Sequence, residues 1–111
     1  MSLDDIQKDV EKWISQFKSG YWSIEYQLGQ LQEESGELAR EILHKYGPKK
    51  KKESELGSCI GDEIVDVMFV LVCMANKEKL SLQEYWNKMM QERLYKRDQN
   101  RYERKDNANN S

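Results

Sequence analysis

Apolar residues recur at intervals of three and four along most of the chain, which is the spacing of amphipathic helices. Four helices are predicted, with short connections between them. Their expected spans are, in order, about Leu3 to Lys18, about Ser23 to Tyr46, from between Ser54 and Ser58 to about Asn76, and from Ser81 into the basic stretch that follows. The pattern therefore predicts an all-α fold, a four-helix bundle.

The apolar faces of the two central helices differ in width. The second helix has a narrow stripe, made of Leu28, Leu31, Leu38 and Ile42. The stripe of the third helix is made of Ile60, Ile64, Val67, Met68, Leu71 and Ala75, and beyond Asp66 this helix is apolar all round. A helix of that kind is buried on every side, which four helices of this length cannot easily achieve in a monomer. We therefore expect a subunit interface, in a dimer or a tetramer.

Length and composition narrow the class of protein. The chain has 111 residues, which fits one domain, expected over residues 1–105 and followed by a polar tail at 106–111 that we expect to be disordered. The net charge of −2 argues against a general nucleic-acid binder. No apolar run approaches the ~20 residues needed to span a bilayer, so no membrane contact is expected. The charged N-terminus does not look like a signal peptide, and two cysteines give no disulfide framework, so a cytoplasmic location is expected.

Acidic residues three apart occur on both central helices. One pair is Glu34 and Glu37, and the other is Glu63 and Asp66. Residues three apart share a helix face, so four carboxylates would meet if the two helices pack together. Two like charges about 4 Å apart repel by roughly 4 kcal/mol at an effective dielectric of about 20, which makes a cation necessary. Mg²⁺ prefers such oxygen ligands and leaves positions for phosphates, and Mn²⁺ can substitute. Glu41, on the same flank, is expected to be an exposed acid outside the site.

The sequence around the acids carries a resemblance to a known family. Residues 31–39 read Leu-Gln-Glu-Glu-Ser-Gly-Glu-Leu-Ala, and residues 61–69 read Gly-Asp-Glu-Ile-Val-Asp-Val-Met-Phe. The motifs Glu33-Glu34-x-x-Glu37 and Glu63-x-x-Asp66 resemble those of the MazG-like nucleoside triphosphate pyrophosphohydrolases, in the all-α NTP pyrophosphatase superfamily. The resemblance covers roughly residues 3–103.

This resemblance implies a Mg²⁺-dependent hydrolase that cleaves a nucleoside triphosphate between the α- and β-phosphates, in a role such as nucleotide-pool housecleaning. It implies that the metal ligands are Glu34, Glu37, Glu63 and Asp66. Glu33 and Glu34 are the expected catalytic residues, and Glu33 would order or activate the attacking water.

Substrate contacts are expected from two other regions. The fourth helix offers Asn87, Lys88, Arg97 and Arg101 for the phosphates, although its arginines suit surface ion pairs equally well. Trp22 is expected to provide an apolar wall for the base and sugar, whereas Trp13 fits the core better. The basic run Lys49–Lys52 is expected to be solvated or, as the alternative, to guide anionic substrate.

Three other functions are weighed against this one. A phosphoribosyl-ATP pyrophosphohydrolase would share the metal chemistry, and the carboxylates alone do not separate the two. A non-catalytic helical scaffold would keep the bundle, but all four expected ligands are present. A di-iron carboxylate bundle would need Glu-x-x-His motifs, which neither acidic motif provides.

Overall fold

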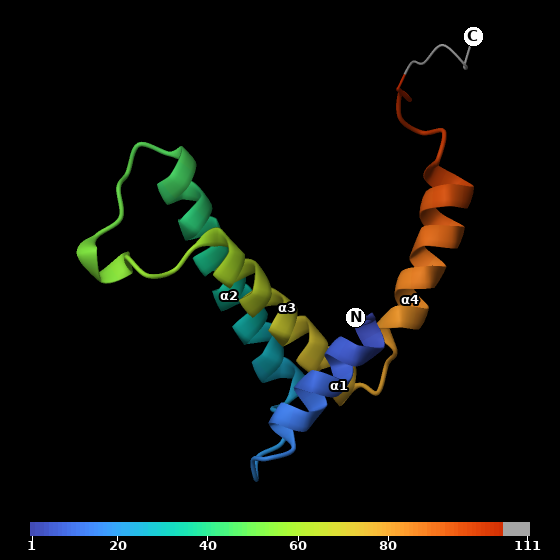
Figure 1. Ribbon diagram of the computed structural model, residues 1–111, viewed down its shortest axis with the longest axis horizontal. Coiled ribbons are helices and arrows are strands. Elements are labelled where there is room, and N and C mark those ends of the chain that lie inside the picture. The colour runs from blue at the N-terminus through green and yellow to red at the C-terminus, as the bar shows by residue number, and fades with distance from the viewer. Residues whose placement is uncertain (106–111) are drawn as a thin grey trace.

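The computed structural model describes residues 1–105, and these are helical apart from connecting loops. The expectation for the tail at 106–111 lies outside the described residues. The elements are, in order, α1 (Leu3–Ile14), α2 (Ile24–Tyr46), the short 3₁₀ helix η1 (Glu53–Glu55), α3 (Ile60–Lys77), α4 (Leu82–Lys88) and the π-helical segment η2 (Met89–Asp98), which continues α4 (Figure 1). The predicted all-α fold with four helices is confirmed.

Three serines begin α1, α2 and α4 as N-caps. The hydroxyl oxygen of Ser2 accepts from the Asp5 backbone N–H, and the Ser23 and Ser81 hydroxyls each do the same for the residue three positions on. Such caps satisfy backbone donors that have no partner within the helix. The sequence could therefore place the beginnings of these helices closely.

Two predicted helix boundaries are wrong, the end of the first helix and the beginning of the third. The first helix ends at Ile14 rather than near Lys18, because the backbone tightens into i→i+3 hydrogen bonds before Gly20, which has φ +59°. The third helix begins at Ile60 rather than between Ser54 and Ser58. The residues before it form η1 and an extended turn at Gly57, where φ is +121°. This φ favours glycine and is not helical, so α3 cannot extend back through Gly57.

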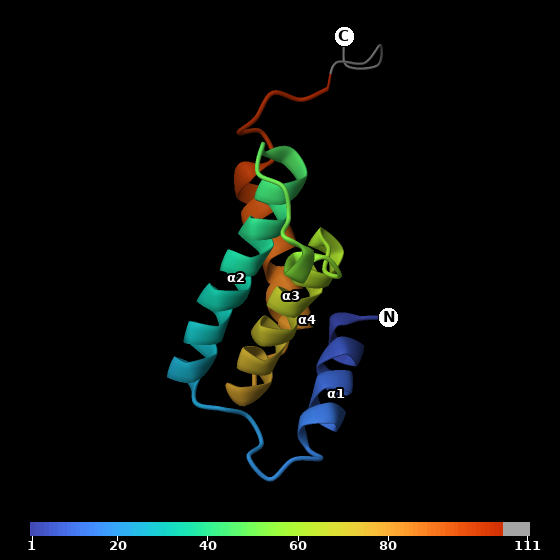
Figure 2. The same ribbon diagram turned by 90° about the vertical axis from the view of Figure 1, so that its left-hand side faces the viewer.

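Helices α2 and α3 lie side by side and run in opposite directions (Figure 2). Helix α1 packs on the C-terminal half of α3, where Val10 meets Val72 and Cys73 in the small core. A polar latch fixes the same junction, because Gln7 Nε2 donates to Asn76 Oδ1 over 2.8 Å and Asn76 Nδ2 donates to the Tyr21 hydroxyl over 2.9 Å. The latch and the core together set the position of α1.

Helix α4 extends away from the α2–α3 pair and is held by α1 (Figure 1). Leu82 N–H donates to Gln7 Oε1 over 2.8 Å, and Leu3 N–H donates to Gln83 Oε1 over 3.1 Å. The radius of gyration is 18.7 Å, whereas a compact domain of this length has about 13 Å. The single chain is therefore open. Within residues 1–105, none of the helices is long and apolar enough to cross a membrane.

The predicted apolar stripes are only partly buried, with Leu31 and Leu38 of α2 half-buried. On α2, Gln27 and Glu41 are buried, whereas Leu28 and Ile42 are about half exposed. On α3, Ala75 of the predicted stripe is buried, but Ile64, Met68 and Leu71 are exposed, and Val70 and Cys73, outside the stripe, are buried. Periodicity locates an apolar face but does not say which surface covers it. Here the polar face of α2 meets α3, and much of the apolar face points outward.

Candidate metal centre and adjacent pocket

The structure brings together the four carboxylates that the sequence pairs on α2 and α3. One carboxylate oxygen from each lies within 4.8 Å of those of the other three, and the residues are Glu34, Glu37, Glu63 and Asp66. Glu63 is buried, Glu34 and Glu37 are half-buried, and Asp66 is exposed. The cluster therefore has a buried floor between the helices and an open side toward solvent.

Crowding changes the acidity of these groups. Burial is the main cause that raises the pKa of Glu34 to about 7, and the charge of Glu37 adds to it. Burial also raises the pKa of Glu63, followed by the charges of Glu37, Asp66 and Glu41. A cation at the cluster would reverse both effects, because it favours the ionised carboxylates.

Two oxygens of the cluster lack partners among the described residues. Oε2 of Glu34 and Oε2 of Glu63 are buried and make no hydrogen bond. Buried polar atoms are nearly always paired, so each such atom calls for a ligand. Four converging carboxylates with two unpartnered oxygens suit a hard divalent cation, since Mg²⁺ and Mn²⁺ take oxygen ligands. The donor set therefore fits the predicted metal. Glu33, next to Glu34 in the chain, is exposed.

A pocket of about 370 Å³ lies next to the carboxylate cluster, since its lining residues Gln30 and Phe69 are about one helical turn from Glu34 and Asp66. Aromatic side chains contribute much of its wall, and its lining includes Trp13, Phe17, Tyr21, Trp22 and Phe69. The predicted position of Trp13 in the core is wrong for the single chain, because 54% of the residue is exposed. Trp22 meets the Tyr26 ring edge-on, with centroids 4.9 Å apart.

Gln27 also lines this pocket and was not predicted as a site residue. Only 2% of it is exposed, and its Oε1 has no hydrogen-bond partner among the described residues. Leaving such a polar atom unsatisfied costs about 1–3 kcal/mol. The signal in the sequence was its position, since Gln27, Glu34 and Glu41 are seven residues apart and so lie on one face of α2.

Glu41 is the clearest error among the predicted exposed residues. Only 6% of it is exposed, and its Oε2 lies 2.6 Å from Lys51 Nζ while its Oε1 accepts from the Ser58 hydroxyl over 2.8 Å. Hydrogen bonds from Lys51 and then Ser58 hold the pKa of Glu41 below its usual range. Lys51 therefore does not behave as a member of a solvated basic run.

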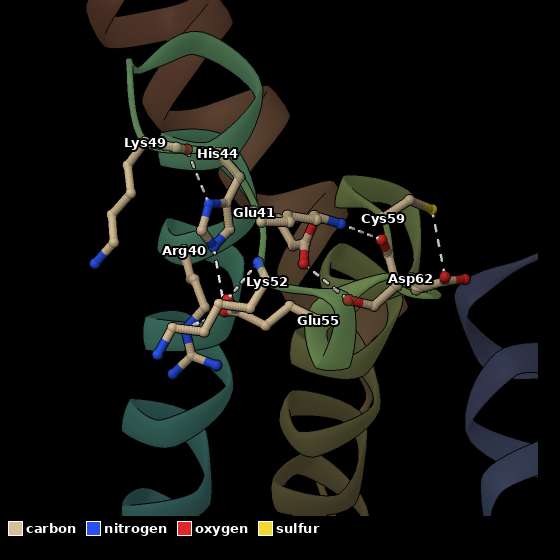
Figure 3. A network of polar contacts seen from close by, with 10 residues as sticks. Arg40, Glu41, His44, Lys49, Lys52, Glu55, Cys59 and Asp62 are labelled. Atoms are coloured by element: carbon tan, nitrogen blue, oxygen red, sulfur yellow. Dashed lines mark hydrogen bonds and ion pairs between the residues drawn. The ribbon is translucent and has the colours of Figure 1, made fainter.

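The same connection is tied to α2 a second time, through Glu55 (Figure 3). His44 Nε2 lies 3.2 Å from Glu55 Oε2, and its Nδ1 lies 3.2 Å from the Lys49 carbonyl oxygen. Arg40 Nε is 4.0 Å from the same Glu55 oxygen. Residues 47–59 are thus fixed against α2 by side chains of both charges.

The predicted phosphate contacts on the fourth helix lie apart from the cluster in the single chain. Asn87 Oδ1 accepts from Gln83 over 3.0 Å, while Arg97 and Arg101 pair with Asp98. The surface pairing expected as one of two roles for the arginines is therefore present. Lys88 is exposed at the last position of α4.

Comparisons with known proteins agree with this arrangement. A family model for the MazG nucleotide pyrophosphohydrolase domain matches residues 23–102, which include both acidic motifs. The protein YpjD of Bacillus subtilis (strain 168) is 45% identical over 105 residues, which cover 95% of this chain and 94% of that protein.

Two solved structures are similar to this one. The crystal structure of YpjD from Bacillus subtilis has a TM-score of 0.72 at 47% identity, covering 81% of this chain and 92% of that chain. The crystal structure of a Bacillus-conserved MazG protein, a nucleotide pyrophosphohydrolase, has a TM-score of 0.69 at 40% identity, covering 81% and 86%. Sequence, fold and the paired acidic motifs lead to one assignment, and the chain belongs to the MazG nucleotide pyrophosphohydrolase family.

Proposed function

We propose that this enzyme hydrolyses nucleoside triphosphates between the α- and β-phosphates, releasing a monophosphate and pyrophosphate, and that the reaction depends on Mg²⁺. The observation that carries the proposal is the meeting of four carboxylates with two buried, unpartnered oxygens. The proposed metal ligands are Glu34, Glu37, Glu63 and Asp66. When bound there, Mg²⁺ would neutralise phosphate oxygens and acidify a water molecule.

Glu33 is the proposed acceptor of the proton from the attacking water. Glu33 directly precedes Glu34 on α2, and its side chain is exposed. Its oxygens are not part of the four-carboxylate cluster. A carboxylate that is not held by the metal remains free to act as a general base. Glu34 is assigned to both the metal and the catalytic step because it would hold the cation that acidifies the water.

The aromatic pocket is the proposed site for the base and sugar. The near wall of the pocket, at Gln30 and Phe69, is about one turn from Glu34 and Asp66, and its far wall, at Gln27, is two turns or about 10 Å along α2 from Glu34. This is comparable to the span of a nucleoside that carries its α-phosphate. Trp22 would stack on the base, and the unpaired Oε1 of Gln27 would accept a hydrogen bond from its edge.

The phosphate contacts from the fourth helix require a second copy of the chain under this proposal. Asn87, Lys88, Arg97 and Arg101 lie on a segment that extends away from α2 and α3 (Figure 1). Apolar residues on α3, including Val65, Met68 and Phe69, are substantially exposed. Self-association as a dimer or tetramer would cover this surface and could present α4 and η2 to a neighbouring cluster.

A substrate panel tests the reaction class. Purified protein is incubated with each nucleoside triphosphate and with phosphoribosyl-ATP, with Mg²⁺ and with EDTA, and the products are separated. We expect Mg²⁺-dependent monophosphate and pyrophosphate from at least one nucleoside triphosphate. Release of diphosphate and phosphate would place the cut at a different bond. Turnover of phosphoribosyl-ATP alone would replace the proposed substrate class.

A further inference from the structure

We propose that Lys51 is a positioning residue, which holds Glu41 outside the carboxylate cluster and fastens the connection 47–59 to α2. The inference rests on the proposed function in one respect, namely that the cluster binds a divalent cation. Neither Lys51 nor Glu41 belongs to the predicted ligand set. Their role concerns the number of carboxylates that the cation meets.

The contacts of Lys51 form a closed triangle. Its Nζ lies 2.6 Å from Glu41 Oε2 and donates to the Ser58 carbonyl oxygen over 2.7 Å, while the Ser58 hydroxyl donates to Glu41 Oε1 over 2.8 Å. Both oxygens of Glu41 are therefore engaged. The side chains of Lys51 and Glu41 are 21% and 6% exposed, so the pair is largely removed from water and from screening by salt.

Glu41 needs this restraint because it lies next to the cluster. It is one helical turn beyond Glu37, and one pocket is lined by Glu37, Glu41 and Glu63 together. A fifth free carboxylate at this distance would add negative charge to the cluster and compete for the cation, since divalent ions accept additional oxygen ligands. Engagement by Lys51 and Ser58 leaves the ion to the predicted four.

The restraint also reaches the beginning of α3. Ser58 directly precedes Cys59, the N-cap of α3, and the Cys59 carbonyl oxygen accepts from the Glu63 N–H over 3.1 Å. The second tie, between His44 and Glu55, holds the middle of the same connection (Figure 3). Lys51 thereby links a charge on α2 to the helical turn that carries Glu63.

Binding of Mn²⁺ alone, measured by calorimetry without nucleotide, tests the proposal. Lys51→Met leaves the Glu41 carboxylate uncompensated, so we expect the affinity to rise about tenfold. Glu41→Gln leaves the Lys51 ammonium uncompensated beside the cluster, so we expect the affinity to fall about tenfold. The double variant Lys51→Met/Glu41→Gln should return to within about twofold of wild type. Lys50→Met, in the same basic run at an exposed position, is the control and should not change the affinity.

The opposite signs separate positioning from general damage. If Lys51 served only to support the loop, both single variants would bind Mn²⁺ more weakly and the double variant would be no better. That result, or unchanged affinity in both single variants, would overturn the proposal. If Lys51→Met does not fold, Lys51→Gln replaces it, and it should also bind Mn²⁺ more tightly than wild type, whereas loop support alone predicts weaker binding. Failure of wild-type protein to bind Mn²⁺ would contradict the proposed function itself.

Discussion

At the scale of single residues, two oxygen atoms decide what the cluster can bind. Oε2 of Glu34 and Oε2 of Glu63 are buried and have no hydrogen-bond partner among the described residues, and both residues belong to a cluster with two further acids. A buried carboxylate is tolerated when it is protonated, paired or bound to a metal. Burial raises the pKa of Glu34 to about 7, which favours the first of these solutions when no metal is bound. A bound cation provides the third at neutral pH.

Asp66→Asn tests the ligand assignment. The substitution removes one charged oxygen ligand, so we expect kcat to fall about 100-fold or more at saturating Mg²⁺. The metal-free variant should melt at a slightly higher temperature than wild type, because repulsion within the cluster decreases. Steady-state kinetics and thermal melting in EDTA measure these two effects separately.

Asp62→Asn is the matched control for this prediction. Asp62 lies on the first turn of the same helix, is exposed, and accepts from the Cys59 thiol over 3.3 Å without joining the cluster. Its substitution should leave turnover near normal. Full activity in the Asp66 variant, or equal losses in both variants, would remove Asp66 from the proposed site.

At the scale of the elements, α2 shows where prediction from sequence succeeded and where it failed. Its span and its serine cap were readable, since local signals set them. The acidic pairs could be predicted from their spacing and from the sequence motifs around them. The contact face could not, because Gln27, Glu34 and Glu41 oppose the rule that apolar residues face the neighbouring helix. Lys51 was missed for a different reason, since its pairing with Glu41 depends on the path of the connection.

A prediction follows for Gln27, the first buried polar residue on this face of α2. Gln27→Met keeps the size of the side chain and removes the unpaired amide oxygen, so we expect the protein to become more stable by about 1 kcal/mol. If Gln27 contacts the base, KM should rise about tenfold while kcat changes little, because uniform binding is lost. Thermal melting and steady-state kinetics with the best substrate of the panel check both.

Gln32→Met is the control for this change on the same helix, at an exposed position. It should alter neither the melting temperature nor KM by a measurable amount. A stabilised Gln27→Met variant with unchanged KM would show that the pocket does not hold the base. That result would not bear on the proposed metal ligands in the carboxylate cluster.

At the scale of the whole molecule, the described chain is more open than a compact domain of its length. The sequence predicted a buried third helix, yet 60% of Val65 and 42% of Met68 are exposed in the single chain. Contiguous apolar surface of this kind marks an interface in soluble proteins. The expected self-association stays a prediction, and it accounts for both the outward stripe and the distant fourth helix.

Val65→Lys tests the assembly. A charge placed in an apolar interface is costly to bury, so we expect the variant to shift toward monomer and to lose activity together with assembly. Light scattering coupled to gel filtration gives the mass of wild type and variant. Leu56→Lys, at a 63% exposed position on the connection before α3, should keep the wild-type mass. A monomeric wild type with full activity would contradict the prediction.

The neighbouring positions of the two acidic motifs in the chain also bear on how the enzyme is made. Helices α2 and α3 are consecutive, and loop-closure entropy grows only slowly with loop length, so closing this hairpin across residues 47–59 costs little more entropy than a shorter loop would. Contacts between neighbouring elements form quickly, and synthesis proceeds from the N-terminus. All four carboxylates have been synthesised by Asp66, before any residue of α4 exists. The nascent chain can thus bring its four carboxylates together in the hairpin first and add the fourth helix afterwards.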